Sequence, residues 1–160
     1  MNKTIPYLNT LFLCFVVVLL MSCNPKHDFV YLTGKPGDLE DLKGHWIILN
    51  FWAEWCSPCR AEVKVLSEIA NENQIPNLSI VGISYDPLEM PDLKRIVGDW
   101  QFGYPVISTH PAPILPFSLP KQLPALYILS PELKLVAKVN GEQDLKSINK
   151  LLNSLRNKIN

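Results

Sequence analysis

A chain of 160 residues is long enough to bury the hydrophobic core of one domain of common size. Its 15 basic and 15 acidic residues cancel, and no basic cluster interrupts the balance, which argues against a nucleic acid or an acidic polymer as partner. The sequence contains no internal repeat, which excludes a repeat architecture.

The first 22 residues have the features of a secretory signal and are left out of the fold prediction. Lys3 supplies a positive charge, and the apolar run from Leu11 to Met21 is shorter than the roughly 20 residues that span a membrane. The run ends in Leu20-Met21-Ser22-Cys23, which resembles the lipobox of bacterial lipoproteins and implies a lipid on Cys23. An uncleaved membrane anchor is the alternative.

Both alternatives place the domain in the cell envelope, anchored to a membrane and facing the periplasm or another extracytoplasmic space, where disulfides persist. In the lipoprotein, Cys14 leaves with the signal and Cys23 carries the lipid, so only Cys56 and Cys59 remain as thiols. This arithmetic favours a redox pair. The chain then divides into a signal peptide at 1–22, a tether at 23–28 and a domain at 29–160.

Apolar, β-prone stretches alternate with helical patterns along this domain. Phe29–Leu32 is predicted as a peripheral strand, and a short helical turn at Asp38–Lys43 ends at Gly44. The core is predicted to contain strand 46–52, helix 57–72, strand 78–84, helix 91–101, a short strand at 104–107, strands 125–129 and 133–139, and helix 142–158. The order of strand, helix and strand at its start implies a parallel pair of strands.

Residues 105–124 hold six prolines, a density that precludes a regular helix and favours extended or turn conformations. The two strands that follow are joined by Ser130-Pro131-Glu132, which is typical of a hairpin. Parallel strands followed by a hairpin and a closing helix predict an α/β fold.

Two cysteines, Cys56 and Cys59, lie where strand 46–52 gives way to helix 57–72. A thiol at a helix N-terminus faces unpaired backbone N–H groups and the positive end of the helix dipole, and both favour the thiolate. Because the thiolate attacks disulfides, this position predicts thiol–disulfide exchange. A zinc site would need a second ligand pair, which the sequence lacks, and a structural disulfide would need neither the aromatic run nor the helix start.

The segment from Phe51 to Cys59, FWAEWCSPC, resembles the active-site segment of thioredoxin-fold proteins. The longer stretch Asp38–Trp52 resembles the TlpA/ResA-like (DsbE-like) branch, the membrane-tethered thiol–disulfide oxidoreductases of the bacterial envelope. Arg60 and Glu62 match this branch, whereas Lys64 stands at its usual proline. The resemblance implies a thioredoxin-like fold, with a central mixed sheet flanked by helices, an N-terminal extension and an inserted strand–helix unit.

Cys56 is expected to be the attacking nucleophile, because it lies first, at the exposed helix start, and Cys59 the more buried thiol that resolves the mixed disulfide. The reverse assignment is the alternative. Trp55 is expected to cover the site and to contact partners, whereas Phe51 and Trp52 are expected to be packing residues.

Pro124 matches the cis-proline that thioredoxin-like proteins place beside their cysteine pair, and an ordinary loop proline is the alternative. A cis bond would present the backbone of Leu123 to an extended substrate, which would bind by main-chain hydrogen bonds. Ala125 departs from the threonine that is common after this proline.

Glu62 lies three residues beyond Cys59 on the same helical face and is the expected acceptor or relay for the proton of the buried thiol. A solvated surface glutamate is the alternative. Asn50 stands where cytoplasmic thioredoxins have a buried aspartate, and its amide does not titrate at neutral pH. Glu62 is therefore the third candidate catalytic residue, after the two cysteines.

These features predict a monomeric, membrane-anchored thiol–disulfide oxidoreductase that acts on protein substrates without a cofactor, because the cysteine pair carries the electrons. Ser57-Pro58 holds no histidine or other cation that would strongly stabilise the Cys56 thiolate, which favours a reductant over a strong oxidant. By resemblance, its task is to reduce envelope cysteines such as those of apocytochrome c during haem attachment, and a membrane electron donor re-reduces it.

Two other classes of function stay open. His110 together with Cys56 and Cys59 would suit copper, because soft thiolates and imidazole are copper ligands, and such a module would bind or deliver the metal. The spacing does not require this, and no metal is assigned. The other class is a redox-inert lipoprotein. A peroxiredoxin is disfavoured, because the proline-containing motif around a peroxide-attacking cysteine is missing.

Overall fold

The computed structural model describes residues 27–159, so the predicted signal peptide and Cys23 lie outside the described residues. At its centre is a five-stranded mixed sheet with the strand order β5-β4-β3-β6-β7. Its strands are β3 (Trp46–Trp52), β4 (Leu78–Ser84), β5 (Val106–Ile107), β6 (Ala125–Leu129) and β7 (Leu135–Asn140). Strand β3 pairs in parallel with β4, as predicted, and antiparallel with β6, which forms the predicted hairpin with β7.

Strand β3 is buried along its whole length, which explains why its sequence is almost continuously apolar. Successive side chains point to opposite faces of the sheet. Ile47 and Leu49 therefore belong to one hydrophobic cluster, and Ile48 belongs to another on the opposite face.

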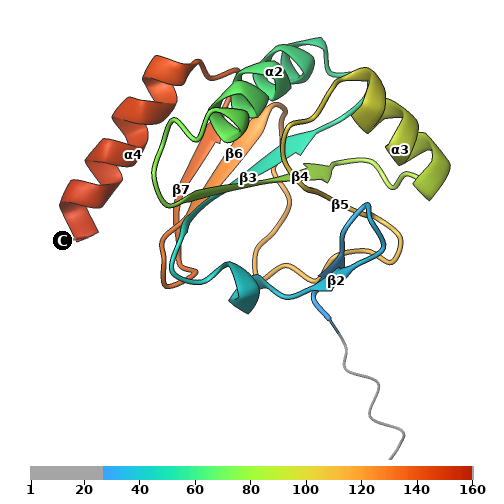
Figure 1. Cartoon of the computed structure of the whole chain (residues 1–160), viewed down its shortest axis with the longest axis horizontal. Coiled ribbons are helices and arrows are strands. Elements are labelled where there is room, and N and C mark those ends of the chain that lie inside the picture. Colours follow the sequence, from blue (N-terminus) through green and yellow to red (C-terminus); the bar gives the residue numbers. More distant parts are fainter. Residues whose placement is uncertain (1–26, 160) are drawn as a thin grey trace, which may run out of the picture.

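Three helices, α2 (Ser57–Asn71), α3 (Met90–Asp99) and α4 (Leu145–Ile159), lie on the same side of the sheet (Figure 1). Leu66 of α2 and Leu152 of α4 share a cluster with Ile48. Leu93 of α3 packs in a further cluster with Trp52, which points to the same face as Ile48. The predicted helices are confirmed to within three residues at their ends.

The opposite face of the sheet is covered by short elements and irregular chain rather than by α-helices. Strands β1 (Phe29–Val30) and β2 (Pro36–Gly37) form an antiparallel pair, and a 3-10 helix, η1 (Leu39–Leu42), follows. The predicted strand at 29–32 is shorter than expected and lies outside the central sheet, as predicted, but its first side chain, Phe29, is 2% exposed and belongs to the same cluster as Ile47.

The proline-rich segment forms the rest of that cover. From Ser108 to Pro124 the chain has no regular helix or strand, as predicted, and Leu115 and Phe117 pack against the cluster of Ile47. The peptide bonds before Pro111 and Pro124 are cis. The many prolines thus account for the irregular conformation of this segment, which cannot form a regular helix.

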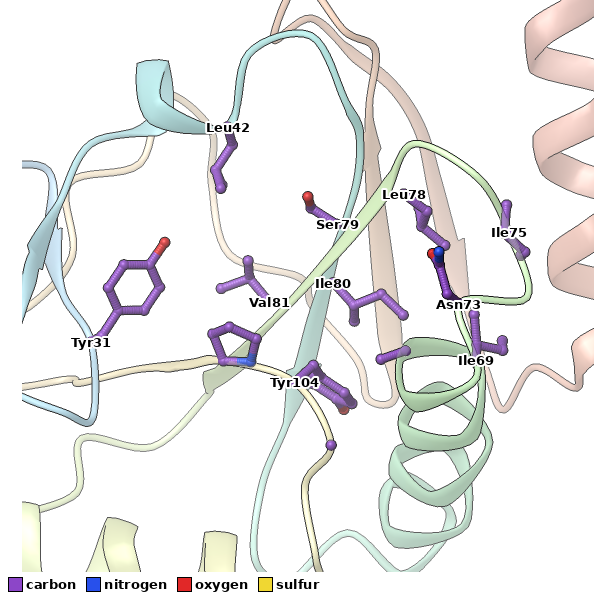
Figure 2. A pocket seen from close by; sticks show the side chains of 13 residues that line it. Tyr31, Leu42, Ile69, Asn73, Ile75, Leu78, Ser79, Ile80, Val81 and Tyr104 are labelled. Atoms are coloured by element: carbon purple, nitrogen blue, oxygen red, sulfur yellow. The ribbon is translucent and has the colours of Figure 1, made fainter.

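Strand β5 contains only two residues and begins later than predicted. It pairs with Gly82 and Ile83, which leaves the first half of β4 at the edge of the sheet. A cavity of about 280 Å³ lies at this edge, and Figure 2 shows Tyr104, Ile80 and Leu78 among the side chains that line it. Among the described residues, no helix is long and apolar enough to cross a membrane.

Candidate active site

Cys56 and Cys59 form a disulfide at the start of helix α2, with an S–S distance of 2.05 Å and a Cα–Cα distance of 5.3 Å. Cys56 is the N-cap residue, and its Sγ accepts a hydrogen bond of 3.3 Å from the backbone N–H of Cys59. Pro58 occupies the first turn, where its missing N–H costs nothing. An N–H donor and the helix dipole both face the sulfur of Cys56, so its thiolate is favoured when the pair is reduced.

Both cysteines are buried, although to different degrees. Cys59 is 0% exposed, as expected of the inner thiol, and Cys56 is 4% exposed. The expectation of an exposed Cys56 is therefore wrong for the disulfide form. Leu88 and Leu123, from two loops, are among the partly buried residues that pack against the cluster that contains both cysteines.

Trp55 directly precedes Cys56 in the chain. Its side chain is 68% exposed, and its indole N–H donates a hydrogen bond of 2.7 Å to Asp86. Trp52 and Phe51 are fully buried, which confirms their expected packing role. Trp55 therefore exposes a large aromatic surface one residue before Cys56.

The segment of Leu123 and Pro124 contacts the cluster that contains the cysteine pair through Leu123. The peptide bond between them is cis, as predicted, and Leu123 packs against the cluster that holds Cys56 and Cys59. The carbonyl of Pro124 accepts a hydrogen bond from the N–H of Gly141, at the end of β7. A backbone hydrogen bond thus ties this segment to the end of the hairpin.

Glu62 is fully buried on α2, so the alternative of a solvated surface glutamate is wrong. Its Oε2 accepts a hydrogen bond of 2.9 Å from the amide of Asn50, and its Oε1 accepts one of 3.0 Å from the backbone N–H of Gln143. Burial raises the pKa of Glu62 to about 8, and the charge of Glu142 adds to this, although both hydrogen bonds oppose it. The group therefore changes its charge near the pH at which thiols ionise.

Asn50 is itself held by a buried hydroxyl. Its Oδ1 accepts a hydrogen bond of 2.9 Å from the phenol of Tyr104, whose pKa is raised well above its ordinary value by burial and by the nearby Glu62. Sequence reasoning did not find Tyr104 or Gln143. Tyr104 is far from Asn50 in the chain, and Gln143 contributes a backbone group that carries no residue-type signal.

The side chain of His110 contacts the segment just before helix α3. Its Nδ1 is 3.1 Å from the carbonyl oxygen of Leu88, and its Nε2 is 3.9 Å from a carboxylate oxygen of Glu89. Within residues 27–159, no group of three or more histidine, cysteine, aspartate or glutamate side chains is placed to hold a metal ion.

The fold and the site together define a class of protein. A disulfide-bonded C-x-x-C pair opens the helix after the central strand of a mixed sheet, and the residue before a cis-proline packs against the cluster that contains the pair, as in thioredoxin-like proteins of the thiol–disulfide oxidoreductase type. The sequence matches the AhpC/TSA family over residues 24–138, and the chain belongs to that family.

Similar proteins agree with this assignment. The thiol-disulfide oxidoreductase ResA of Bacillus cereus is 30% identical over 70% of this chain, and the match spans 64% of that protein's length. ResA of Bacillus subtilis is 28% identical over 77% of this chain and 68% of its own. A putative thiol:disulfide interchange protein DsbE from Chlorobium tepidum superposes with a TM-score of 0.67 at 18% identity, covering 82% of this chain and 92% of its own, which shows the shared fold.

Proposed function

We propose that this chain reduces disulfides of protein substrates on the extracytoplasmic side of a bacterial membrane. The observation that carries the proposal is the Cys56–Cys59 disulfide at the N-terminus of α2, with Cys59 fully buried behind Cys56. The names of the ResA relatives support the same chemistry.

In the reduced protein, the Cys56 thiolate attacks one sulfur of a substrate disulfide. A bond forms between Cys56 and that sulfur, and the other substrate sulfur leaves as a thiolate. Cys59, once deprotonated, attacks the sulfur of Cys56, closes the intramolecular disulfide and releases the first substrate sulfur. Two electrons have then passed from the cysteine pair to the substrate, whose two thiolates take up protons.

Glu62 is the group that we propose as acceptor of the proton from Cys59. It lies one helical turn beyond Cys59, and its pKa of about 8 is close to that of a free thiol, about 8.5. Near-equal pKa values allow transfer in either direction at little cost, which suits a group that serves both half-reactions.

The substrate surface that we propose includes Trp55, Leu123 and Pro124. Trp55 directly precedes Cys56 and has the most exposed large apolar side chain of the described residues. Leu123, in the loop before β6, packs against the cysteine cluster. A substrate that lies between them presents its sulfur to Cys56 and pairs with the backbone of Leu123.

The membrane location rests on the N-terminal sequence. We propose that Cys23 is lipidated after removal of residues 1–22, that a membrane electron donor re-reduces the pair, and that the substrates include apocytochrome c. The lipobox-like Leu20-Met21-Ser22-Cys23 supports this placement.

A matched pair of variants tests the reaction order. Cys59→Ser leaves the attacking thiol without its resolving partner, so a mixed disulfide with a disulfide-bonded protein substrate should accumulate on non-reducing gels. Cys56→Ser should accumulate none. Equal trapping by both variants, or trapping by Cys56→Ser alone, contradicts the assignment.

The direction of electron flow is tested by equilibrating the whole chain in thiol buffers and following tryptophan fluorescence. A reduction potential of roughly −270 to −220 mV supports the reductant. A value near about −120 mV would make the chain an oxidant of folding proteins.

A further inference from the structure

Tyr104 reaches Asn50 through a gap in the surface of the sheet. Asn50 lies opposite Gly82 in the parallel register of β3 and β4, so both residues face the helices. A side-chain carbon on Gly82 would come within 3.3 Å of the Tyr104 ring. Because Gly82 has no side chain, the ring lies across β4 and its hydroxyl meets the Asn50 amide.

The ring of Tyr104 is fixed by its neighbours. It packs edge-on against Phe102 with the ring centroids 5.2 Å apart, and it borders the cavity at the sheet edge (Figure 2). The carbonyl oxygen of the next residue, Pro105, accepts a hydrogen bond from the backbone N–H of Gly82. The position of the hydroxyl is therefore set by the chain between α3 and β5, outside the cysteine motif.

The hydroxyl determines which side of the Asn50 amide meets Glu62. An amide has an acceptor oxygen on one side and a donor NH₂ on the other. The Tyr104 phenol donates to Oδ1, so the NH₂ group points at Oε2 of Glu62. A donor at the amide oxygen also polarises the amide, which strengthens the hydrogen bond that the NH₂ group donates to the carboxylate.

We propose that Tyr104 is a positioning residue of this site, whose phenol holds the Asn50 amide with its N–H toward Glu62 and thereby favours the charged carboxylate. The functional part of this inference rests on the proposed role of Glu62 as proton acceptor for Cys59. The other groups that face Glu62 are the charged Glu142 and the backbone N–H of Gln143, from the turn before α4, and neither contacts Tyr104 by a hydrogen bond.

Tyr104→Phe removes one oxygen atom and keeps the ring. In the whole oxidised chain, with ¹³C-labelled glutamate carboxyl groups, an NMR titration should show the pKa of Glu62 raised by about one unit, which corresponds to the loss of one ordinary hydrogen bond. Glu62→Gln identifies the signal by removing it.

Tyr127→Phe is the matched control. Tyr127 is also buried in the sheet and donates its hydroxyl to the carbonyl of Ser118, which has no part in the Glu62 network. This variant should leave the pKa of Glu62 unchanged. If Tyr104→Phe folds poorly, Asn50→Leu tests the step on which the positioning role depends, since it removes the amide donor and should raise the pKa of Glu62 at least as far; an unchanged pKa would overturn the inference.

The inference is overturned if the Glu62 pKa is unchanged or lowered in Tyr104→Phe, or if Tyr127→Phe moves it equally. The second readout is the pH profile of disulfide exchange, whose midpoint should move upward with the carboxyl pKa and stay fixed when Tyr104→Phe is made in a Glu62→Gln background. A shifted carboxyl in a chain that exchanges no disulfide would support the positioning role and contradict the proposed function.

Discussion

The carboxyl group of Glu62 is the point at which three separate parts of the chain meet. Asn50 of β3 and the backbone of Gln143 both donate to it, and burial still raises its pKa to about 8. Hydrogen bonds that favour the charged form are thus outweighed by the loss of hydration. The protonation of a single buried acid between helix and sheet is therefore linked to the stability of the fold.

We expect the free energy of unfolding to fall as the pH rises from about 5 to about 8. In this window the unfolded chain has released the Glu62 proton, with an ordinary pKa of 4.5, while the folded chain retains it. The loss is on the order of a few kcal/mol and ends above pH 8, where both states are ionised. Denaturant unfolding of the oxidised chain across this range measures it.

The control for this prediction is Glu62→Gln, in which the slope between pH 5 and 8 should largely disappear. Three other carboxyl groups have pKa values lowered by hydrogen bonds: Asp38, Glu132 and Asp144. They titrate at lower pH, so they contribute little to the change in unfolding free energy between pH 5 and 8. An equal slope in the Gln variant would assign the dependence to other groups.

At the scale of elements, the short β1–β2 pair is part of the core. Gly37 of β2 faces Phe29 of β1, and the ring of Phe29 lies against the underside of the sheet. A side-chain carbon on Gly37 would come within 2.5 Å of that ring and 2.8 Å of Tyr31. Position 37 requires glycine because the ring of Phe29 lies so close to its backbone, and this ring is buried in the core and has little freedom to move.

Gly37→Ala should therefore destabilise the protein by about 1–3 kcal/mol through displacement of Phe29. Gly98→Ala, in helix α3 with open space around the new carbon, should stabilise it by about 0.5–1 kcal/mol. Urea unfolding of both variants makes the comparison. A neutral Gly37→Ala would mean that β1 and β2 contribute little to the core.

At the scale of the whole molecule, the sheet has two unlike covers. Helices α2, α3 and α4 cover one face, and the N-terminal elements together with the proline-rich segment cover the other (Figure 1). Helix α4 lies over the same cluster as α2 and β3, with Ile148 and Leu152 almost fully buried. The last element of the chain thus completes the core on which the active-site helix rests.

Leu152→Ala should cost about 2–5 kcal/mol, because it opens a cavity between α4 and the sheet. Leu145→Ala, at the exposed start of the same helix, should change stability by less than about 0.5 kcal/mol. We expect far-UV circular dichroism and tryptophan fluorescence to report one shared transition in each variant, since α4 and β3 share a cluster. Separate transitions would show that α4 unfolds independently.

Local sequence by itself determined the redox centre and the order of the elements. Spacing and capping are short-range properties, so the strand before Cys56, the helix that it caps and the parallel pair of β3 and β4 followed from the sequence pattern. The cis bond before Pro124 was likewise predicted from its match to a known motif.

Only the tertiary structure decided what surrounds that centre. Tyr104 meets Asn50 across 54 residues, and Gln143 meets Glu62 across 81. The periodicity of a helix or strand assigns a side chain to a face, but the register of distant segments decides which group it meets there. For the same reason, the burial of Cys56 and the place of Phe29 in the core emerged only when the chain was folded.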